Sequence, residues 1–297
     1  MSLTLLGHIS AIITIIIWGT TFVSTKVLLN HGFTPIEILF YRFLMGWAAL
    51  WLIYPKRMSS TNRKQELYFA AAGLCGVTLY FLFENIALTY TLVSNVGVIV
   101  CISPFATALL SQYFLKSEKP GIFFYIGFLI AITGIFIISF NGNMTLNVNP
   151  LGDLLALLAS LVWAIYSILI KKISAFGHNN IQTTRTIFFY GILLMIPALF
   201  FSDFKFELTQ FNDLTNLFNI LFLGLGASAF CFVSWTFSVN ILGAIKTSVY
   251  IYAIPAITVL TSALILKEPL TPLLALGMSL TIIGLFLSER KLAPPSK

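Results

Sequence analysis

The chain contains two copies of one apolar pattern, and each copy holds five stretches long enough to cross a bilayer. Equivalent residues recur in the same order: Gly7, Trp18, Pro104, Glu118, Gly127 and Gly134 against Gly152, Trp163, Pro255, Glu268, Gly277 and Gly284. Because five is odd, the second copy must cross a membrane in the opposite sense to the first. Inverted repeats commonly enclose a small-molecule site at their interface, so the pattern predicts a transporter.

The composition supports a membrane protein. Charged residues make up 9% of the chain and hydrophobic residues 58%, and the mean hydropathy is +0.95. A soluble domain carries about 25% charged residues. The predicted fold is an all-α integral membrane protein with ten transmembrane helices, arranged as two inverted five-helix repeats. The ten spans are expected at 4–29, 35–54, 67–88, 94–115, 121–140, 151–172, 180–201, 217–239, 245–266 and 271–288.

The repeats also define the expected domains and topology. The first copy occupies 1–140, a connecting loop 141–150, the second copy 151–290 and a cytoplasmic tail 291–297. Lys and Arg gather in 54–66, 115–120, 171–180 and the tail, which all fall on one side of the membrane. Basic loops favour the cytoplasm, so both termini are predicted to be cytoplasmic in a multi-pass protein of the cell membrane. The net charge of +7 is therefore a topology signal, and no nucleic-acid partner is expected.

Together these features resemble the drug/metabolite transporter superfamily, EamA type. The resemblance rests on two sets of five helices, Trp18-Gly19, the two prolines, the acidic residues within 115–118 and 266–269, and the paired glycines. It covers about residues 7–288. It implies a central cavity lined by the first, third, fourth, sixth, eighth and ninth helices, with the fifth and tenth peripheral. Family members with assigned roles mostly move amino acids, nucleosides, sugars or other metabolites, often outward.

Two charges within predicted spans need an explanation, because charge in lipid is costly. Arg42 and Glu84 lie at similar depth on adjacent helices. They are interpreted either as a structural ion pair or as groups that bind the carboxylate and the ammonium or proton of a cargo. Arg185 is expected to be the counterpart of Arg42 and to reach the inner headgroups.

Aromatic and polar residues complete the expected site. Trp18, Trp163 and Tyr166 lie mid-helix, where an indole N–H requires an acceptor, with simple packing as the alternative. Lys246 and Tyr250 lie one turn apart and either bind an anionic group or anchor the helix at the inner surface. The expected substrate-binding residues are Trp18, Arg42, Tyr80, Glu84, Asn95, Trp163, Tyr166, Lys246 and Tyr250.

Pro104 and Pro255 are expected to kink the fourth and ninth helices, because proline removes a backbone hydrogen bond. Freed carbonyls are tolerated only against protein or a wet cavity. Matched interruptions in both copies therefore point to the binding region.

The sequence holds no HExxH, GxSxG or nucleotide-binding loop, so no enzyme, cofactor or metal site is expected. The predicted function is a secondary transporter that exports small metabolites such as amino acids by rocking one copy against the other. A channel-like facilitator and a multidrug or nucleotide-like solute carrier are the alternatives. The expected partners are a small-molecule substrate and the lipid bilayer, with proton coupling open and a monomeric or weakly dimeric chain.

Overall fold

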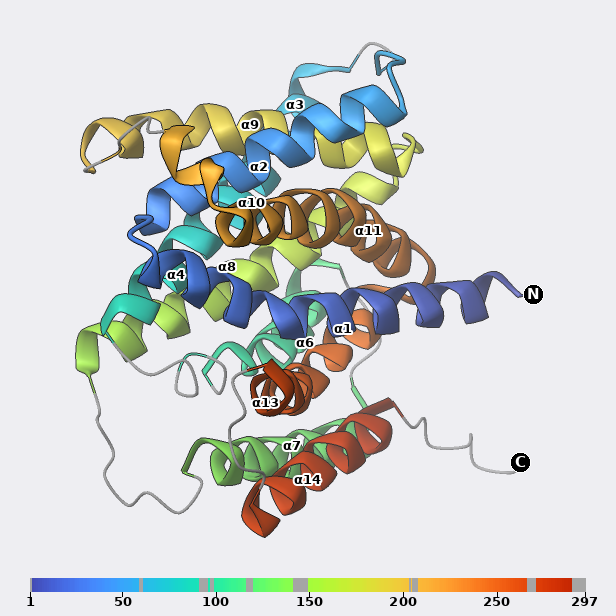
Figure 1. Ribbon diagram of the computed structural model, residues 1–297. Helices are drawn as coiled ribbons and strands as arrows, with labels where there is room; N and C mark the ends of the chain where they lie inside the picture. The colour runs from blue at the N-terminus through green and yellow to red at the C-terminus, as the bar shows by residue number, and fades with distance from the viewer. Residues whose placement is uncertain are drawn as a thin grey trace.

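A computed structural model describes residues 2–58, 61–90, 96, 99–115, 120–140, 149–202, 204, 208–265 and 271–289, and regular structure within these ranges is entirely helical (Figure 1). The single helices of the first copy are α1 (Leu3–Asn30), α2 (Pro35–Ile53), α6 (Ser103–Phe114) and α7 (Ile122–Phe140). Those of the second copy are α8 (Pro150–Ser174), α9 (Asn180–Phe200) and α14 (Pro272–Glu289), with a short 3-10 turn, η2, at Leu208–Asn212.

Three spans change helix type along their length. In the first copy, α3 (Arg63–Gly73) continues through the π-helix η1 (Leu74–Leu79) into α4 (Tyr80–Tyr90). In the second, α10 (Leu214–Leu221) continues through the π-helix η3 (Phe222–Phe230) into α11 (Cys231–Leu242). The ninth span is α12 (Ala244–Val249), the 3-10 segment η4 (Tyr250–Ala253) and α13 (Ile254–Ile265). The described helices account for all ten predicted spans.

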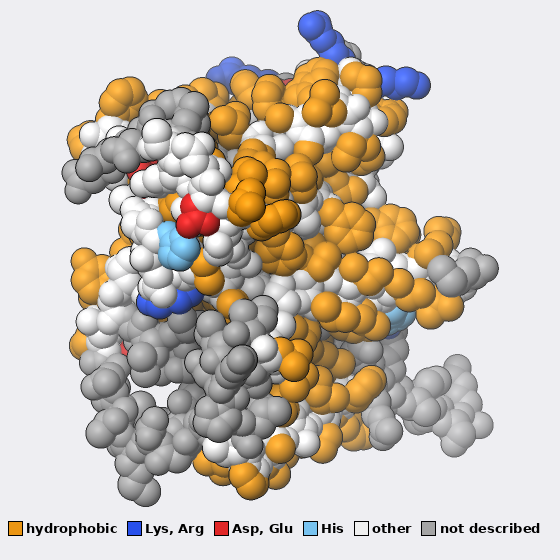
Figure 2. Space-filling view, viewed as in Figure 1, with side chains coloured by type: hydrophobic (Ala, Val, Ile, Leu, Met, Phe, Trp, Pro, Cys, Tyr) orange, Lys and Arg blue, Asp and Glu red, His pale blue; other side chains and the backbone are white. Residues whose placement is uncertain are grey.

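The helices have the length and surface of membrane spans. Seven helical stretches of the described chain are long and apolar enough to cross a bilayer, and 122–137 and 272–288 form shorter apolar helices. Large hydrophobic side chains cover much of the visible surface (Figure 2). Exposed examples on the two shorter apolar helices are Leu129 and Phe286, which are 63% and 64% exposed. The prediction of an all-α integral membrane protein is confirmed.

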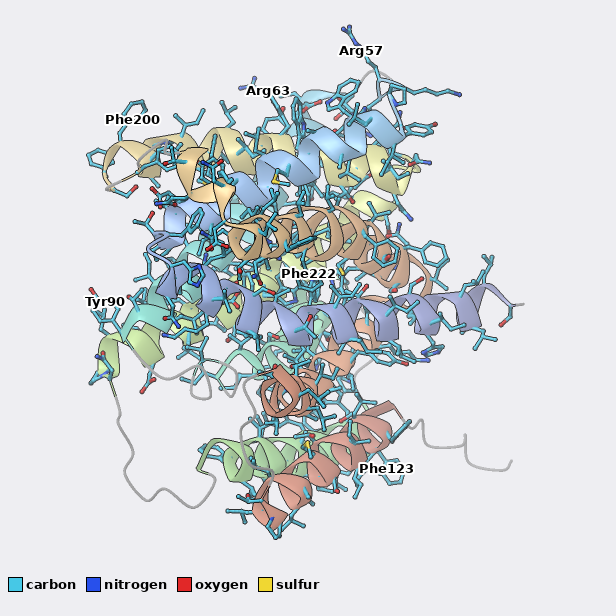
Figure 3. The ribbon with its side chains drawn as sticks, in the orientation of Figure 1. Arg57, Arg63, Tyr90, Phe123, Phe200 and Phe222 are labelled. Carbon is cyan, nitrogen blue, oxygen red and sulfur yellow. The ribbon has the colours of Figure 1, made fainter. Side chains whose placement is uncertain are left out.

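The two sides of the molecule can be told apart by the helix ends. α1 begins, and α2 ends, on the side that we call the terminal face. Tyr90 and Phe200 end α4 and α9 on the opposite face, to the left in Figure 3, whereas α1 begins to the right. Successive spans alternate in direction, so the first helices of the two copies, α1 and α8, begin on opposite faces.

Turns between the first two helices are built alike in both copies. Gly32 (φ +90°) and Gly177 (φ +73°) follow α1 and α8 in the left-handed region that glycine adopts readily. Two residues later, Thr34 and Asn179 begin α2 and α9 as N-caps whose side chains accept backbone N–H hydrogen bonds. Each copy therefore starts with a tight hairpin of two long helices.

Close glycine contacts interlock the copies. A methyl group added at Gly46 of α2 would lie 3.1 Å from the Gly224 carbonyl oxygen in η3. One added at Gly73, which ends α3, would lie 2.6 Å from the Gly191 backbone nitrogen in α9. The second helix of each copy thus packs against the third helix of the other.

This packing also corrects one expected equivalence between the copies. The methyl group at Gly73 would lie 2.6 Å from the Ile187 carbonyl oxygen, and one at Gly224 would lie 3.2 Å from the Arg42 carbonyl oxygen. Ile187, not Arg185, therefore occupies the place of Arg42 in the second copy. The expected pairing was wrong because the offset of 145 residues that relates Trp18 to Trp163 continues through the second helix, as Gly46 and Gly191 show.

The fifth and tenth helices, α7 and α14, pack against each other at the lower edge of Figure 1. A methyl group at Gly127 would lie 2.5 Å from the Gly284 carbonyl oxygen, and one at Gly134 would lie 2.6 Å from that of Gly277. The close helix contact predicted from the paired glycines is confirmed.

Candidate functional site

A small cavity lies between helices of both copies. The space inside it that the centre of a water molecule can occupy is about 30 Å³. One water needs about 10–15 Å³ by this measure, so the cavity has room for about two waters. A metabolite would bind only after the surrounding side chains move apart. The cavity is lined by Trp18, Thr21, Phe22, Arg42, Tyr80, Phe81, Glu84, Val100, Trp163, Ile251 and Ile254.

Arg42 of α2 supplies the positive charge of the cavity. Its side chain is buried, and its Nε donates a 2.7 Å hydrogen bond to the Ser228 hydroxyl in η3. The guanidinium lies over the Phe81 ring, with its carbon 4.3 Å from the ring centroid, in a cation–π contact. These contacts fix Arg42 at the cavity wall while leaving its terminal N–H groups able to bind an anion.

Glu84 of α4 supplies the negative charge and is also buried. Its Oε2 has no hydrogen-bond partner, whereas the Tyr80 hydroxyl, one helical turn earlier, interacts with the same carboxyl group. Arg42 and Glu84 attract each other across the cavity. In the described part of the chain, however, the two side chains form no ion pair within 4 Å. Glu84 thus retains an acceptor oxygen for another group.

Aromatic rings form the remaining cavity wall. Trp18 and Trp163, from the first helix of each copy, meet edge to face with centroids 5.3 Å apart, and Tyr80 lies 4.8 Å from Trp163. The Trp18 indole donates a 2.9 Å hydrogen bond to the Ala227 carbonyl oxygen. The rings continue beyond the cavity in a cluster that we call the aromatic layer: Trp18, Trp163, Tyr166, Phe232 and Trp235.

Each proline lies one residue after an interruption in the α-helical part of its span. Pro104 is the second residue of α6, after a turn at 101–102, and Pro255 is the second residue of α13, after η4. At the start of a helix the missing N–H leaves no carbonyl unpaired, so proline is tolerated there. Val100 and Ile251, which lie within or beside these breaks, line the cavity.

The cavity brings together five of the nine expected substrate-binding residues, namely Trp18, Arg42, Tyr80, Glu84 and Trp163. Three others lie elsewhere. Tyr166 lies in the aromatic layer, Lys246 is half-buried on α12, and the Tyr250 hydroxyl lies 2.6 Å from His8 Nδ1. Asn95 lies outside the described residues.

At the terminal face, Arg185 joins the two copies. Its Nη1 and Nη2 donate to the carbonyl oxygens of Tyr54 and Lys56 at 2.6 and 2.7 Å. Its guanidinium lies 3.7 Å from the centroid of the Trp51 ring. The expectation that Arg185 reaches the lipid headgroups was wrong, because the carbonyl groups at the end of α2 bind it instead.

Two further polar contacts lie on the same face, within the second copy. Lys171 Nζ of α8 donates to the Asn240 carbonyl oxygen at 3.1 Å, and Asn240 Nδ2 donates to Asn180 Oδ1 of α9 at 2.8 Å. These residues lie near the ends of α8 and α11 and at the start of α9. Together with Arg185, they join helix ends at the terminal face.

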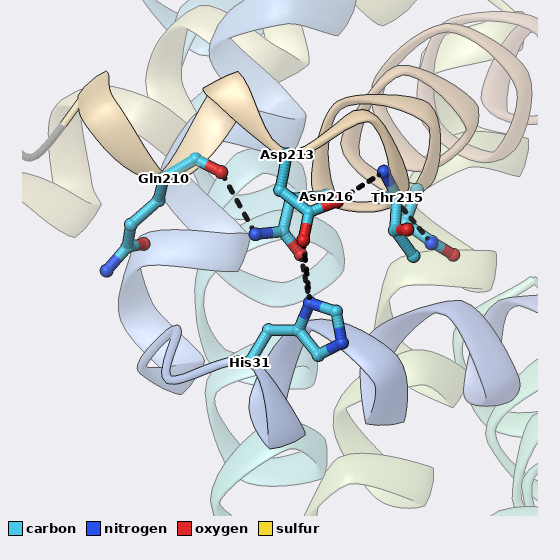
Figure 4. Close-up of polar contacts among 6 residues, drawn as sticks. His31, Gln210, Asp213, Thr215 and Asn216 are labelled. Atoms are coloured by element: carbon cyan, nitrogen blue, oxygen red, sulfur yellow. Dashed lines mark hydrogen bonds and ion pairs between the residues drawn. The ribbon is translucent and has the colours of Figure 1, made fainter.

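On the opposite face, α1 is tied to α10 (Figure 4). His31 Nδ1 lies 2.7 Å from Asn216 Oδ1 and 3.8 Å from Asp213 Oδ2. Asn216 Nδ2 donates to the Gln210 carbonyl oxygen at 2.9 Å. Asp213 Oδ1 accepts the backbone N–H of Thr215 at 2.7 Å, and this hydrogen bond lowers the pKa of the Asp213 carboxyl group.

A largely apolar cavity with one basic and one acidic side chain, enclosed by inverted helical copies, is the architecture of a secondary transporter. The chain matches the EamA-like transporter family over residues 5–140 and 150–290, which correspond to the two copies. It therefore belongs to this family, as its resemblance to EamA-type members of the drug/metabolite transporter superfamily predicted. It is a multi-pass membrane transporter with small-molecule cargo, and not an enzyme.

Individual relatives agree with this assignment. A protein of Archaeoglobus fulgidus named an uncharacterized transporter is 26% identical over 292 residues, which cover 96% of this chain and 97% of the relative. The uncharacterized transporter YyaM of Bacillus subtilis is 26% identical over 276 residues, covering 90% of this chain and 88% of YyaM. A known crystal structure shares the fold, with a TM-score of 0.72, 17% identity, and coverage of 97% of this chain and 96% of that one.

Proposed function

We propose that this transporter exports small metabolites such as amino acids across the cell membrane by alternating access around the cavity. The observation that supports this cargo is that Arg42 and Glu84 line the same cavity without a direct ion pair between them. The Arg42 guanidinium has the planar fork that binds carboxylates, and Glu84 Oε2 has no hydrogen-bond partner among the described residues. An amino acid carries the two complementary charges, and its side chain would lie against Trp18 and Trp163.

A strain that expresses the protein is first screened for tolerance to a panel of toxic amino acids, which identifies candidate cargo. The test is then counterflow of these amino acids in proteoliposomes. Glu84→Gln is expected to lower counterflow at least tenfold. Glu37→Gln is the matched control, because Glu37 is buried at the start of α2, where glutamine also completes a capping box. Equal, unimpaired counterflow in both variants at normal protein levels would leave Glu84 with a structural role only. Saturable counterflow itself separates a carrier from a channel-like facilitator.

The moving units we propose are drawn from both copies. α2 packs on η3 through Gly46 and Gly224, and α9 packs on α3 through Gly191 and Gly73. Rocking one whole copy against the other, as expected from the sequence, would separate both of these close contacts. Units that each combine helices of both copies keep them intact.

Topology and coupling complete the proposal. The basic loops support cytoplasmic termini, so the terminal face would face the cytoplasm. A reporter active only in the cytoplasm should work when fused after Lys297 and fail when inserted within 141–150.

Proton coupling would act through Glu84, and flux measured under imposed pH gradients distinguishes proton exchange from facilitated exit. The chain is proposed to act as a monomer or weak homodimer.

A further inference from the structure

The two copies differ in charge at equivalent places. The glycine contacts place Ile187 where the first copy has Arg42, and the offset from Gly73 to Gly224 places Trp235 where it has Glu84. Both charged residues of the cavity thus have uncharged counterparts. In an inverted repeat, these counterparts lie on the path toward the other face.

The aromatic layer holds unpartnered donors at this place. Trp235 is fully buried and Trp163 is 4% exposed, and neither indole nitrogen has a hydrogen-bond partner. Their ring centroids lie 5.9 Å apart. Tyr166 and Thr236 lie beside them, both fully or almost fully buried, and their hydroxyls interact with each other but with no other described group. Buried polar groups are normally hydrogen-bonded, so two unpartnered indoles and an isolated hydroxyl pair on two adjacent helices require an explanation.

The position of these residues along their helices explains what their free donor groups could bind. Trp163 lines the cavity. Tyr166 follows it on α8, which ends at the terminal face, and Trp235 and Thr236 lie within two turns of the terminal-face end of α11. The unpartnered groups therefore extend from the cavity toward the terminal face, on the side away from Arg42 and Glu84.

We propose that Trp163, Tyr166, Trp235 and Thr236 form a second, uncharged station for the cargo, used when the cavity opens to the terminal face. An indole N–H donates and cannot accept a hydrogen bond, so this station binds an acceptor group of the cargo, a carboxylate or carbonyl oxygen. The cargo would pass between a charged station at Arg42 and Glu84 and a neutral one. This inference rests on the proposed transport function. It adds that the cargo meets a charged station toward one face of the protein and a neutral station toward the other.

The first test needs no cargo. Thr236→Cys, in a background with the three native cysteines replaced by alanine, is exposed to 2-(trimethylammonium)ethyl methanethiosulfonate from either face of membrane vesicles. Thr184→Cys is the matched control, because Thr184 is equally buried with an unpartnered hydroxyl but lies on α9 outside the aromatic layer. We expect labelling of Thr236→Cys from the terminal face at least tenfold faster than that of the control. Equal rates would overturn the proposal, whether or not the protein transports amino acids.

The second test uses an amino acid that the wild-type protein carries. Trp235→Phe keeps one aromatic ring and removes the N–H together with the five-membered ring, and Trp47→Phe makes the same change at a half-buried residue of α2. Trp235→Phe is expected to raise the half-saturation concentration at the terminal face about tenfold and leave that at the opposite face unchanged. An equal change at both faces, or none, would overturn the second station. Failure of the wild-type protein to carry any amino acid would instead refute the proposed cargo, and the labelling experiment still decides whether the station is accessible.

Discussion

The Nε of Arg42 donates a 2.7 Å hydrogen bond to the Ser228 hydroxyl, and this contact joins α2 of the first copy to η3 of the second. The equivalent residues on the other side of the inverted arrangement are Ile187 and Val77, both apolar and fully buried. The two interfaces share their glycine packing but not their polarity. The twofold relation between the copies thus governs the helix frame, while the contact between a guanidinium and a serine hydroxyl is present at only one of these two equivalent places.

Removing the Ser228 hydroxyl should destabilise the protein. Ser228→Ala leaves a buried guanidinium without its recorded acceptor, and a hydrogen bond to a charged group contributes about 1.5–3 kcal/mol. We expect a loss of that size in the free energy of unfolding in detergent. Ser279→Ala is the control, because Ser279 is exposed on α14 and bonds only within its own helix. Equal losses in the two variants would contradict a specific role for the contact.

Adding a methyl group at Gly73 should be costly. Its nearest neighbours would be the Gly191 backbone nitrogen and the Ile187 carbonyl oxygen, both at 2.6 Å, and backbone atoms cannot turn aside as a side chain does. Overpacking of this kind costs about 1–3 kcal/mol, so Gly73→Ala should lower the unfolding temperature. Gly226→Ala offers a comparison within η3, because its methyl group would meet nothing closer than 3.6 Å. If Gly226→Ala proved the more damaging change, the interlocked packing of the copies would be refuted.

The polar part of the cavity could be predicted from the sequence because charge within lipid is rare and costly. Arg42 and Glu84 were found in this way, and Trp18 and Trp163 were found from the repeat. Apolar lining residues such as Phe81 gave no such signal, since apolar side chains fill every span. Ser228 was missed as well, because a serine in a helix is common and its partner lies far away along the chain.

The prolines show that hydrophobic periodicity predicts a helix but not an interruption within it. An uninterrupted apolar run predicts a continuous α-helix with a kink at Pro255. In the structure α12 ends at Val249, the 3-10 segment η4 follows, and α13 begins at Ile254, one residue before this proline. Sequence alone does not reveal whether neighbouring helices leave room for a break. Similarly, Arg185 was expected at the headgroups because its acceptors, backbone carbonyls at the end of α2, carry no side-chain signature.

Stability should depend on pH through Asp213. The backbone hydrogen bond from Thr215 lowers the pKa of this carboxyl group in the folded protein. Its contribution is therefore complete above the ordinary aspartate pKa of about 3.9 and is lost as the pH falls through the lowered value. Asp213→Ala should lower the unfolding temperature at pH 6, and the difference from wild type should shrink as the pH falls below 3.9.

The Asp213→Asn variant distinguishes the helix-capping hydrogen bond of Asp213 from the effect of its negative charge. Asparagine is an equally good N-cap for α10, so this variant should stay close to the wild-type unfolding temperature at pH 6 while losing the attraction to His31. Thermal unfolding in detergent at a series of pH values measures both variants. A deficit in Asp213→Ala that stayed constant down to the lowest pH would show that ionisation of Asp213 contributes nothing.

Breaking the Arg185 contacts should favour opening at the terminal face. Arg185→Gln removes the two hydrogen bonds, of 2.6 and 2.7 Å, that hold the end of α2 against α9. A hydrogen bond to a charged group contributes about 1.5–3 kcal/mol, and 1.4 kcal/mol is about tenfold in an equilibrium constant. We expect a cysteine at Thr21, which lines the cavity, to react at least tenfold faster with an impermeant thiol reagent added at the terminal face. Arg63→Gln, at an exposed cation that begins α3 on the same face, should not change this rate. Faster labelling in both variants would point to a general effect of surface charge, and an unchanged rate in Arg185→Gln would mean that these contacts do not hold the terminal face closed.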